Sequence, residues 1–70
     1  MKKNVIGKHL KELRKEKGLT ERQLGKLLNF SNQTISAWEN GTREPTLDAL
    51  IAIADIFEVS TDELLGRKDY

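Results

Sequence analysis

The chain has 70 residues, enough for one small domain with a marginal hydrophobic core. It contains no cysteine, so neither a disulfide framework nor a cysteine-based zinc site is available. No apolar run approaches a membrane span or a signal-peptide core, and we therefore expect a cytoplasmic protein without a membrane partner. A single proline and the lack of alternating apolar residues predict an all-α fold.

The charges are divided unevenly along the chain, although the net charge is only +1. Residues 1–45 hold ten Lys or Arg against five Asp or Glu, whereas residues 46–70 hold two against six. Two interpretations stay open. Either the first two-thirds of the chain faces a polyanion, or both runs are solvated helix faces.

Five helices are predicted, in a single compact domain that covers residues 1–70 and has its core at about residues 4–66. The first helix runs roughly over residues 4–17, and Gly18 stops it. The tail, residues 67–70, is predicted to be frayed. The apolar stripe of the first helix consists of Ile6, Leu10 and Leu13. The lone His9 is expected on the surface.

Hydroxyl residues mark the start of each later helix. The second helix opens at Thr20, where Gln23 completes a capping box, and its apolar positions are Leu24, Leu27 and Leu28. The third opens at Ser31 and ends at Gly41. The fourth opens at Thr46, and one face carries Leu47, Leu50, Ile53, Ala54 and Phe57. The fifth has a capping box of Ser60 with Glu63, apolar residues Leu64 and Leu65, and a stop at Gly66.

The join between the second and third helices is predicted to be a tight crossing. Gly25 costs about 1 kcal/mol in a helix interior, so a close approach of the third helix is expected to offset that cost. Asn29 tolerates the positive φ that the turn needs, and Phe30 is expected to fill the corner.

A projection at about 100° per residue divides the third helix into two faces. Ile35 and Trp38 turn inward, against Leu24 and Leu28. The outward face carries no charge, only short or amide side chains: Asn32, Gln33, Ser36 and Ala37. An ordinary solvated helix face is usually rich in Lys and Glu, whereas this face is built of groups that can press against a base edge.

These features resemble the Cro/phage-repressor type of helix-turn-helix domain, the XRE family. The resemblance covers about residues 4–66. It includes the segment WENGTREP at Trp38–Pro45 and the segment PTLDALIAIADIFEVSTDELLG at Pro45–Gly66. It implies a five-helix bundle whose second and third helices form the helix-turn-helix. It also implies a transcriptional regulator, expected to be a repressor, that binds double-stranded operator DNA, generally as a dimer.

Residue roles follow from position in this motif, where the N-terminal part of the third helix enters the major groove. The predicted base readers are Asn32, Gln33, Ser36 and Ala37. The predicted phosphate contacts are Thr20, Gln23, Thr34, Asn40, Thr42 and Arg43. Gln23 has the capping box as a competing role, and Thr34 either touches phosphate or only packs. Arg14 and Glu39 occupy positions that form an internal salt bridge in related domains, and we expect them to pair.

One departure from the family bears on DNA contact. Many members carry Gln directly after the first cap of the second helix, where it reaches a phosphate. Glu21 stands there in this chain and cannot donate a hydrogen bond, which puts that contact in doubt.

Other functions are disfavoured by what the sequence lacks. No nucleophile–base set, carboxylate pair or metal cluster is visible, so we expect neither an enzyme nor a cofactor or small-molecule pocket. The alternatives that remain are an antitoxin and a protein-interaction module on the same fold. Because the apolar surface for self-association is small, we expect a monomer in dilute solution and a weak homodimer, formed either on DNA or through another region.

Overall fold

A computed structural model of the protein describes residues 6–66, and all regular structure in that range is helical. The helices are α1 (Ile6–Glu16), α2 (Glu21–Leu28), α3 (Asn32–Asn40), α4 (Leu47–Phe57) and α5 (Thr61–Leu65). The prediction of an all-α, five-helix fold is confirmed. The expected start of the first helix at residue 4 and the tail at residues 67–70 lie outside the described residues.

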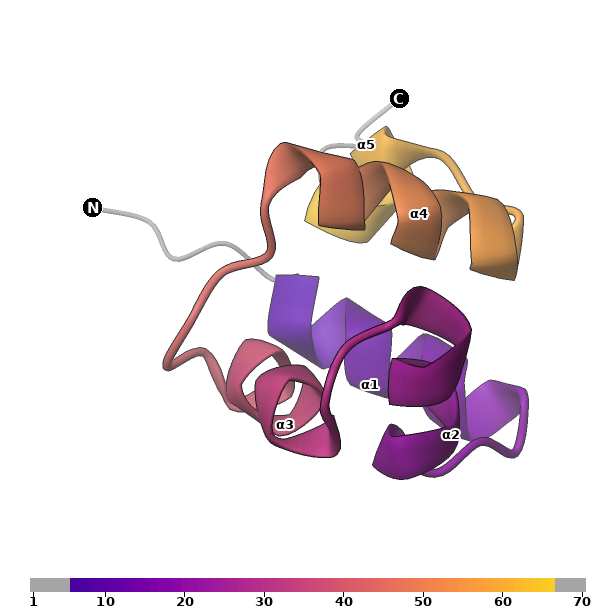
Figure 1. Ribbon diagram of the computed structural model, residues 1–70. Helices are drawn as coiled ribbons and strands as arrows, with labels where there is room; N and C mark the ends of the chain where they lie inside the picture. The colour runs from indigo at the N-terminus through magenta and orange to yellow at the C-terminus, as the bar shows by residue number, and fades with distance from the viewer. Residues whose placement is uncertain (1–5, 67–70) are drawn as a thin grey trace.

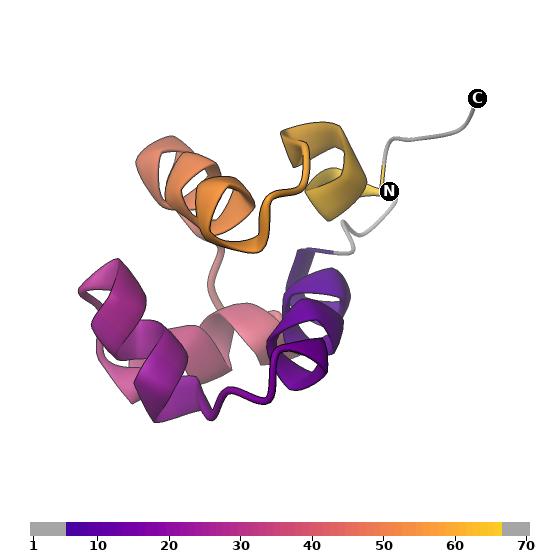
Figure 2. The same ribbon diagram turned by 90° about the vertical axis from the view of Figure 1, so that its right-hand side faces the viewer.

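The helices form two layers (Figures 1 and 2). In both views α4 and α5 lie side by side over a lower group made of α1, α2 and α3. The principal contacts join α3 to α1 and α2, α5 to α1 and α4, and α2 to α4. Every helix therefore contributes to one core between the layers. The buried members of that core are Leu10, Leu24, Leu28, Ile35, Trp38, Ala49, Ile53, Phe57 and Leu64.

The helix starts follow the hydroxyl residues expected from the sequence. Thr20, Ser31, Thr46 and Ser60 have extended backbones, and each side chain accepts a hydrogen bond from the backbone N–H three residues later. Both capping boxes are present, at Thr20 with Gln23 and at Ser60 with Glu63. Each cap is worth about 1 kcal/mol, because it satisfies an N–H that has no partner inside the helix.

Two leucines on the expected apolar faces lie in solvent instead. Leu47 is 71% exposed and Leu27 is 59% exposed. In α4 the buried residues are Ala49, Ile53, Ala54 and Phe57, whereas Leu47, the first residue of the helix, lies at the edge of that arc and is exposed. The sequence pattern placed Leu47 on the apolar face and left out Ala49, whereas the structure buries Ala49 and exposes Leu47.

His9, expected at the surface of a helix, lies on α1 but also makes a contact that the sequence did not indicate. His9 is half-buried, and its Nδ1 lies 3.1 Å from the carbonyl oxygen of Glu63 and 3.2 Å from that of Leu64. Since a carbonyl can only accept, Nδ1 carries the proton and fastens α1 to the end of α5. Beside this contact, an open groove of about 410 Å³ lies along the junction of α1 and α5, with an acidic rim that includes Glu12 and Glu16.

Among residues 6–66, no helix is long and apolar enough to span a membrane.

Candidate nucleic-acid interface

The turn between α2 and α3 is built as the sequence indicates, with one difference in which atoms approach. Asn29 adopts the left-handed conformation, with φ of 66°. A Cβ added to Gly25 would lie 2.4 Å from the carbonyl oxygen of Phe30 and 3.4 Å from the carbonyl carbon of Ser31. The close neighbour of Gly25 is thus the backbone leading into α3, and glycine is required there to keep the turn tight.

Apolar contacts hold the crossing in place from the inside. Ile35 and Trp38 of α3 are buried in the same cluster as Leu24 and Leu28 of α2, as predicted. Phe30 packs edge-on against Trp38, with ring centroids 4.8 Å apart and planes at 67°. Because Phe30 is 39% exposed, it covers the corner without being enclosed by it.

The outward face of α3 presents polar groups that the described structure leaves unused. Gln33 is exposed, and Asn32, Ser36 and Ala37 are partly exposed. Among residues 6–66, the side chains of Asn32, Gln33 and Ser36 make no hydrogen bond. Two amides and a hydroxyl on one rigid helix are therefore available to an external partner.

The start of α3 uses its hydroxyl groups locally. The Ser31 hydroxyl oxygen accepts a hydrogen bond of 3.2 Å from the backbone N–H of Thr34. The hydroxyl oxygens of Ser31 and Thr34 lie 3.0 Å apart, within hydrogen-bond distance. Thr34 is partly buried, so of the two roles left open for it, local packing has direct support in the structure.

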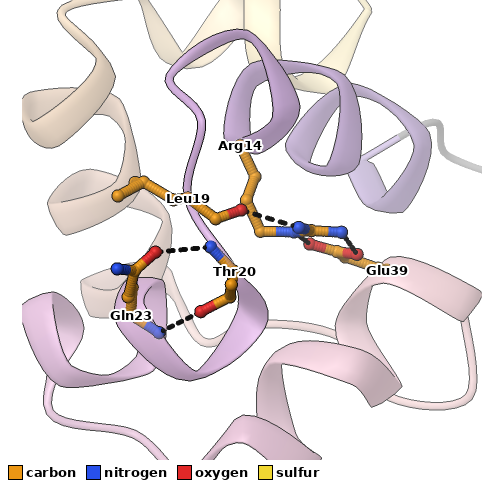
Figure 3. Close-up of polar contacts among 5 residues, drawn as sticks. All are labelled: Arg14, Leu19, Thr20, Gln23 and Glu39. Carbon is orange, nitrogen blue, oxygen red and sulfur yellow. Dashed lines mark hydrogen bonds and ion pairs between the residues drawn. The ribbon is translucent and has the colours of Figure 1, made fainter.

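The start of α2 reconciles the two roles considered for Gln23 (Figure 3). The side-chain oxygen of Gln23 accepts a hydrogen bond from the backbone N–H of Thr20 at 2.8 Å. The backbone N–H of Gln23 donates to the Thr20 hydroxyl at 3.0 Å. The box engages only the amide oxygen. Among residues 6–66 the amide nitrogen has no hydrogen-bond partner, and the cap fixes the direction in which it points.

The loop after α3 is ordered by its own hydrogen bonds. The side-chain oxygen of Asn40 accepts from the backbone N–H of Thr42 at 3.1 Å and from its hydroxyl at 2.7 Å. Gly41 supplies the left-handed residue, with φ of 84°. This arrangement uses the donors of Thr42 internally. Within the described range, the amide nitrogen of Asn40 and the exposed guanidinium of Arg43 have no partner and can contact an anion.

The predicted pair of Arg14 and Glu39 is confirmed (Figure 3). Nε of Arg14 donates to Oε2 of Glu39 at 2.6 Å, and Nη2 donates to Oε1 at 3.1 Å, a two-pronged contact. The side chains are only 11% and 4% exposed. Nη1 also donates to the carbonyl oxygen of Leu19 at 2.8 Å, so Arg14 joins α1, α3 and the segment before α2.

The hydrogen bond to Glu39 is the main reason why the pKa of Arg14 is raised, and the negative charge of Glu21 adds to it. Glu21 is therefore close enough to Arg14 to influence it electrostatically, although it stands where a phosphate donor is usual in the family.

Gly7 of α1 contacts the backbone at the C-terminal end of α3, a role that was not identified from the sequence. A Cβ on Gly7 would lie 2.4 Å from the carbonyl oxygen of Trp38 and 2.6 Å from that of Glu39. A glycine inside a helix, on the same stripe as Leu10 and Arg14, indicates that another helix approaches closely. The same reasoning identified Gly25 and could have identified Gly7.

A tight turn between two crossing helices, with small and amide side chains facing outward from the second, defines a helix-turn-helix protein. This chain belongs to the helix-turn-helix family of the Cro/phage-repressor (XRE) type, whose model matches residues 10–64.

Two curated relatives show the range of the likeness. Over 64 residues the chain is 38% identical to the HTH-type transcriptional regulator ImmR of Bacillus subtilis, a match that covers 91% of this chain and 50% of ImmR. Over 63 residues it is 32% identical to the antitoxin PezA of Streptococcus pneumoniae, covering 90% of this chain and 40% of PezA. The chain thus spans about half the length, or less, of these relatives.

Solved structures agree with the fold. A transcriptional regulator from Listeria innocua superimposes with a TM-score of 0.89 at 32% identity, covering 99% of this chain and 64% of that one. The P22 c2 repressor in complex with a synthetic operator gives a TM-score of 0.81 at 33% identity, covering 86% of this chain and 91% of that one.

Proposed function

We propose that this chain is a DNA-binding domain of a transcriptional regulator, most simply a repressor, and that it reads double-stranded operator DNA by placing α3 in the major groove. The observation that carries the proposal is the outward face of α3, where Asn32, Gln33 and Ser36 present hydrogen-bonding groups without a partner among the described residues. Solvent alone does not require an uncharged face of this kind, whereas base edges are recognised by such groups.

Roles are assigned within this proposal by reach and by free hydrogen-bonding capacity. Asn32 and Gln33 read bases through their amides, which can be bidentate to adenine, and Ser36 and Ala37 complete the reading surface. Asn40 and Arg43, on the ordered loop after α3, bind phosphate groups of the DNA backbone at one end of the interface. At the other end, Thr20 and the amide nitrogen of Gln23 bind a second set of phosphate groups.

The remaining candidates act more locally. Thr42 supports the Asn40 amide through its internal hydrogen bonds, and Thr34 supports the first turn of α3. The activity proposed is binding, not catalysis, in the cytoplasm. The P22 c2 repressor was solved with operator DNA, and the same type of partner is proposed here.

An antitoxin is the second candidate, favoured by the 32% identity to PezA. An antitoxin would need a toxin-binding surface. The face of α3 carries no large apolar side chain, and the exposed Leu47 and Ile51 lie on α4. A DNA-reading regulator therefore accounts for more of the surface of this domain.

The decisive experiment selects bound sequences from a pool of random DNA duplexes at two salt concentrations. We expect a palindromic consensus with two half-sites about 34 Å apart, because dimers of this motif bind one helical turn apart. Enrichment should persist at the higher salt. A pool that remains random at both concentrations, while the chain is folded, would refute sequence-specific DNA binding.

A further inference from the structure

The C-terminal end of α3 is seated on the backbone of α1. The carbonyl oxygens of Trp38 and Glu39 approach Gly7 so closely that an added Cβ would lie 2.4 and 2.6 Å from them. Carbon–oxygen contacts of this type settle at about 3.3–3.6 Å. Because both neighbours are backbone atoms, no change of side-chain rotamer can relieve the contact. A methyl group at Gly7 must therefore move α3 away from α1 by about 1 Å.

The same face of α1 makes a second attachment to this end of α3. Arg14 lies seven residues after Gly7, two helical turns along the same stripe, and its guanidinium holds the carboxylate of Glu39. Leu10 lies between them and is completely buried. The opposite end of α3 is held by α2, where Gly25 contacts the backbone at Phe30. The two ends of α3 are thus fixed by two different helices.

We infer that Gly7 is a positioning residue for DNA recognition, setting the tilt of α3 and hence the depth at which Ser36 and Ala37 reach the bases. The inference rests on the proposed function. The nine residues of α3 span about 13 Å, so a displacement of about 1 Å at the Gly7 end tilts the helix by roughly 4° about the Gly25 end. Asn32 and Gln33 lie near the pivot and move little, whereas Ser36 and Ala37 move most.

Base recognition is sensitive to a change of this size. Recognition groups must be held within about 0.5 Å of their working position to keep good hydrogen bonds. Replacing Gly7 is therefore expected to reduce sequence discrimination only at the base pairs that Ser36 and Ala37 contact.

The experiment compares Gly7→Ala with a destabilising control, Gly18→Ala. Gly18 has φ of +71°, and no atom of residues 6–66 lies within 4 Å of a Cβ added there. Alanine therefore strains the backbone without displacing a neighbour in the described part of the chain. Both variants are measured at a temperature where circular dichroism shows them folded. The DNA probes are the selected operator, its single-base-pair variants and a random duplex. Ser36→Ala and Gln33→Ala, in the otherwise unchanged chain, identify the base pairs that each side chain reads.

For Gly7→Ala we expect a fall in operator affinity of about ten-fold or more, while affinity for the random duplex changes less than two-fold. The Gly7→Ala variant should lose its discrimination among the four bases at the base pairs identified by Ser36→Ala. It should keep that discrimination at the base pairs identified by Gln33→Ala. Gly18→Ala should keep the operator-to-random ratio of the unchanged chain. An unaltered ratio in folded Gly7→Ala would overturn the inference.

A second variant covers the case in which Gly7→Ala is too unstable. Glu58 has φ of 57° at the end of α4, on a helix that does not contact DNA in the proposed arrangement, so Glu58→Gly relieves backbone strain there. The double variant Gly7→Ala, Glu58→Gly is compared with Glu58→Gly alone. If the double variant still fails to fold, Gly7 has a structural role only and the inference is wrong. If the unchanged chain shows no operator preference, the proposed function fails first, which separates the two outcomes.

Discussion

Gln33 is the most accessible amide on the outward face of α3, and its hydrogen-bonding groups are free in the described structure. We predict that Gln33→Ala lowers affinity for the operator by about 1–3 kcal/mol and removes the preference at one base pair, because a bidentate contact to a base is lost. Competition binding against operators carrying each of the four bases at every position checks this. Equal losses on operator and random DNA would contradict the role of Gln33 as a base reader.

Glu21 places a negative charge at the start of α2, where phosphate is expected to lie. We predict that Glu21→Gln strengthens binding to all DNA sequences by about 0.5–1 kcal/mol, because a charge repelled by phosphate is replaced by a neutral donor. Fluorescence anisotropy with operator and random duplexes measures the gain. Glu12→Gln, which makes the same charge change beside the groove between α1 and α5, is the control and should have a smaller effect. An equal gain from both variants would attribute the effect to net charge alone.

The first turn of α2 combines a helix cap with a proposed phosphate contact, and one substitution separates them. In Gln23→Glu a carboxylate oxygen can still accept from the backbone N–H of Thr20, and its charge favours the helix N-terminus by about 0.3–1 kcal/mol. The same change removes the amide donor. We predict that the free energy of unfolding is kept or rises while DNA affinity falls. Urea denaturation and DNA titration measure the two quantities, and unchanged DNA affinity would leave Gln23 with the capping role alone.

The contact between α1 and α3 depends on a pair of charges that are largely withdrawn from water. Because removal of one partner leaves the other charge without compensation, we predict that Arg14→Ala or Glu39→Ala lowers the free energy of unfolding by about 3 kcal/mol. The double variant should lose less than the sum of the two. Urea denaturation of all four proteins gives the coupling energy. Lys15→Ala, at the neighbouring exposed position, should change stability by less than about 0.5 kcal/mol. Strictly additive losses at Arg14 and Glu39 would argue against the pair.

At the scale of the whole molecule, the excess of positive charge in residues 1–45 fits a domain that approaches a polyanion with α1 to α3. We predict that Arg43→Ala weakens binding to operator and random duplexes alike and reduces the slope of log affinity against log salt by about 1. Lys8→Ala, which removes one exposed positive charge from α1, is the matched control. If both variants reduce the slope equally, the salt dependence reflects net charge and not a contact at Arg43.

Local structure was predictable from the sequence because it depends on hydrogen bonds between residues three or four apart. The caps at Thr20, Ser31, Thr46 and Ser60 and the positive φ of Asn29 follow from the chemistry of those side chains alone. The division of α3 into an apolar and an outward face follows from helical periodicity, and the burial of Ile35 and Trp38 confirms it. The roles of Asn32, Gln33, Ser36 and Ala37 toward bases stay predictions.

Only the tertiary structure decided which atoms of different helices meet. The sequence indicated that Gly25 faces a close neighbour, but not that this neighbour is the carbonyl of Phe30. It gave no partner for His9, grouped the exposed Leu47 with the buried residues of α4, and left Gly7 unnoticed. Such contacts join residues that are far apart in the chain, so they depend on how the helices are placed in space. The sequence by itself determined the helices and their faces. The tertiary structure determined how α1 and α2 hold the two ends of α3.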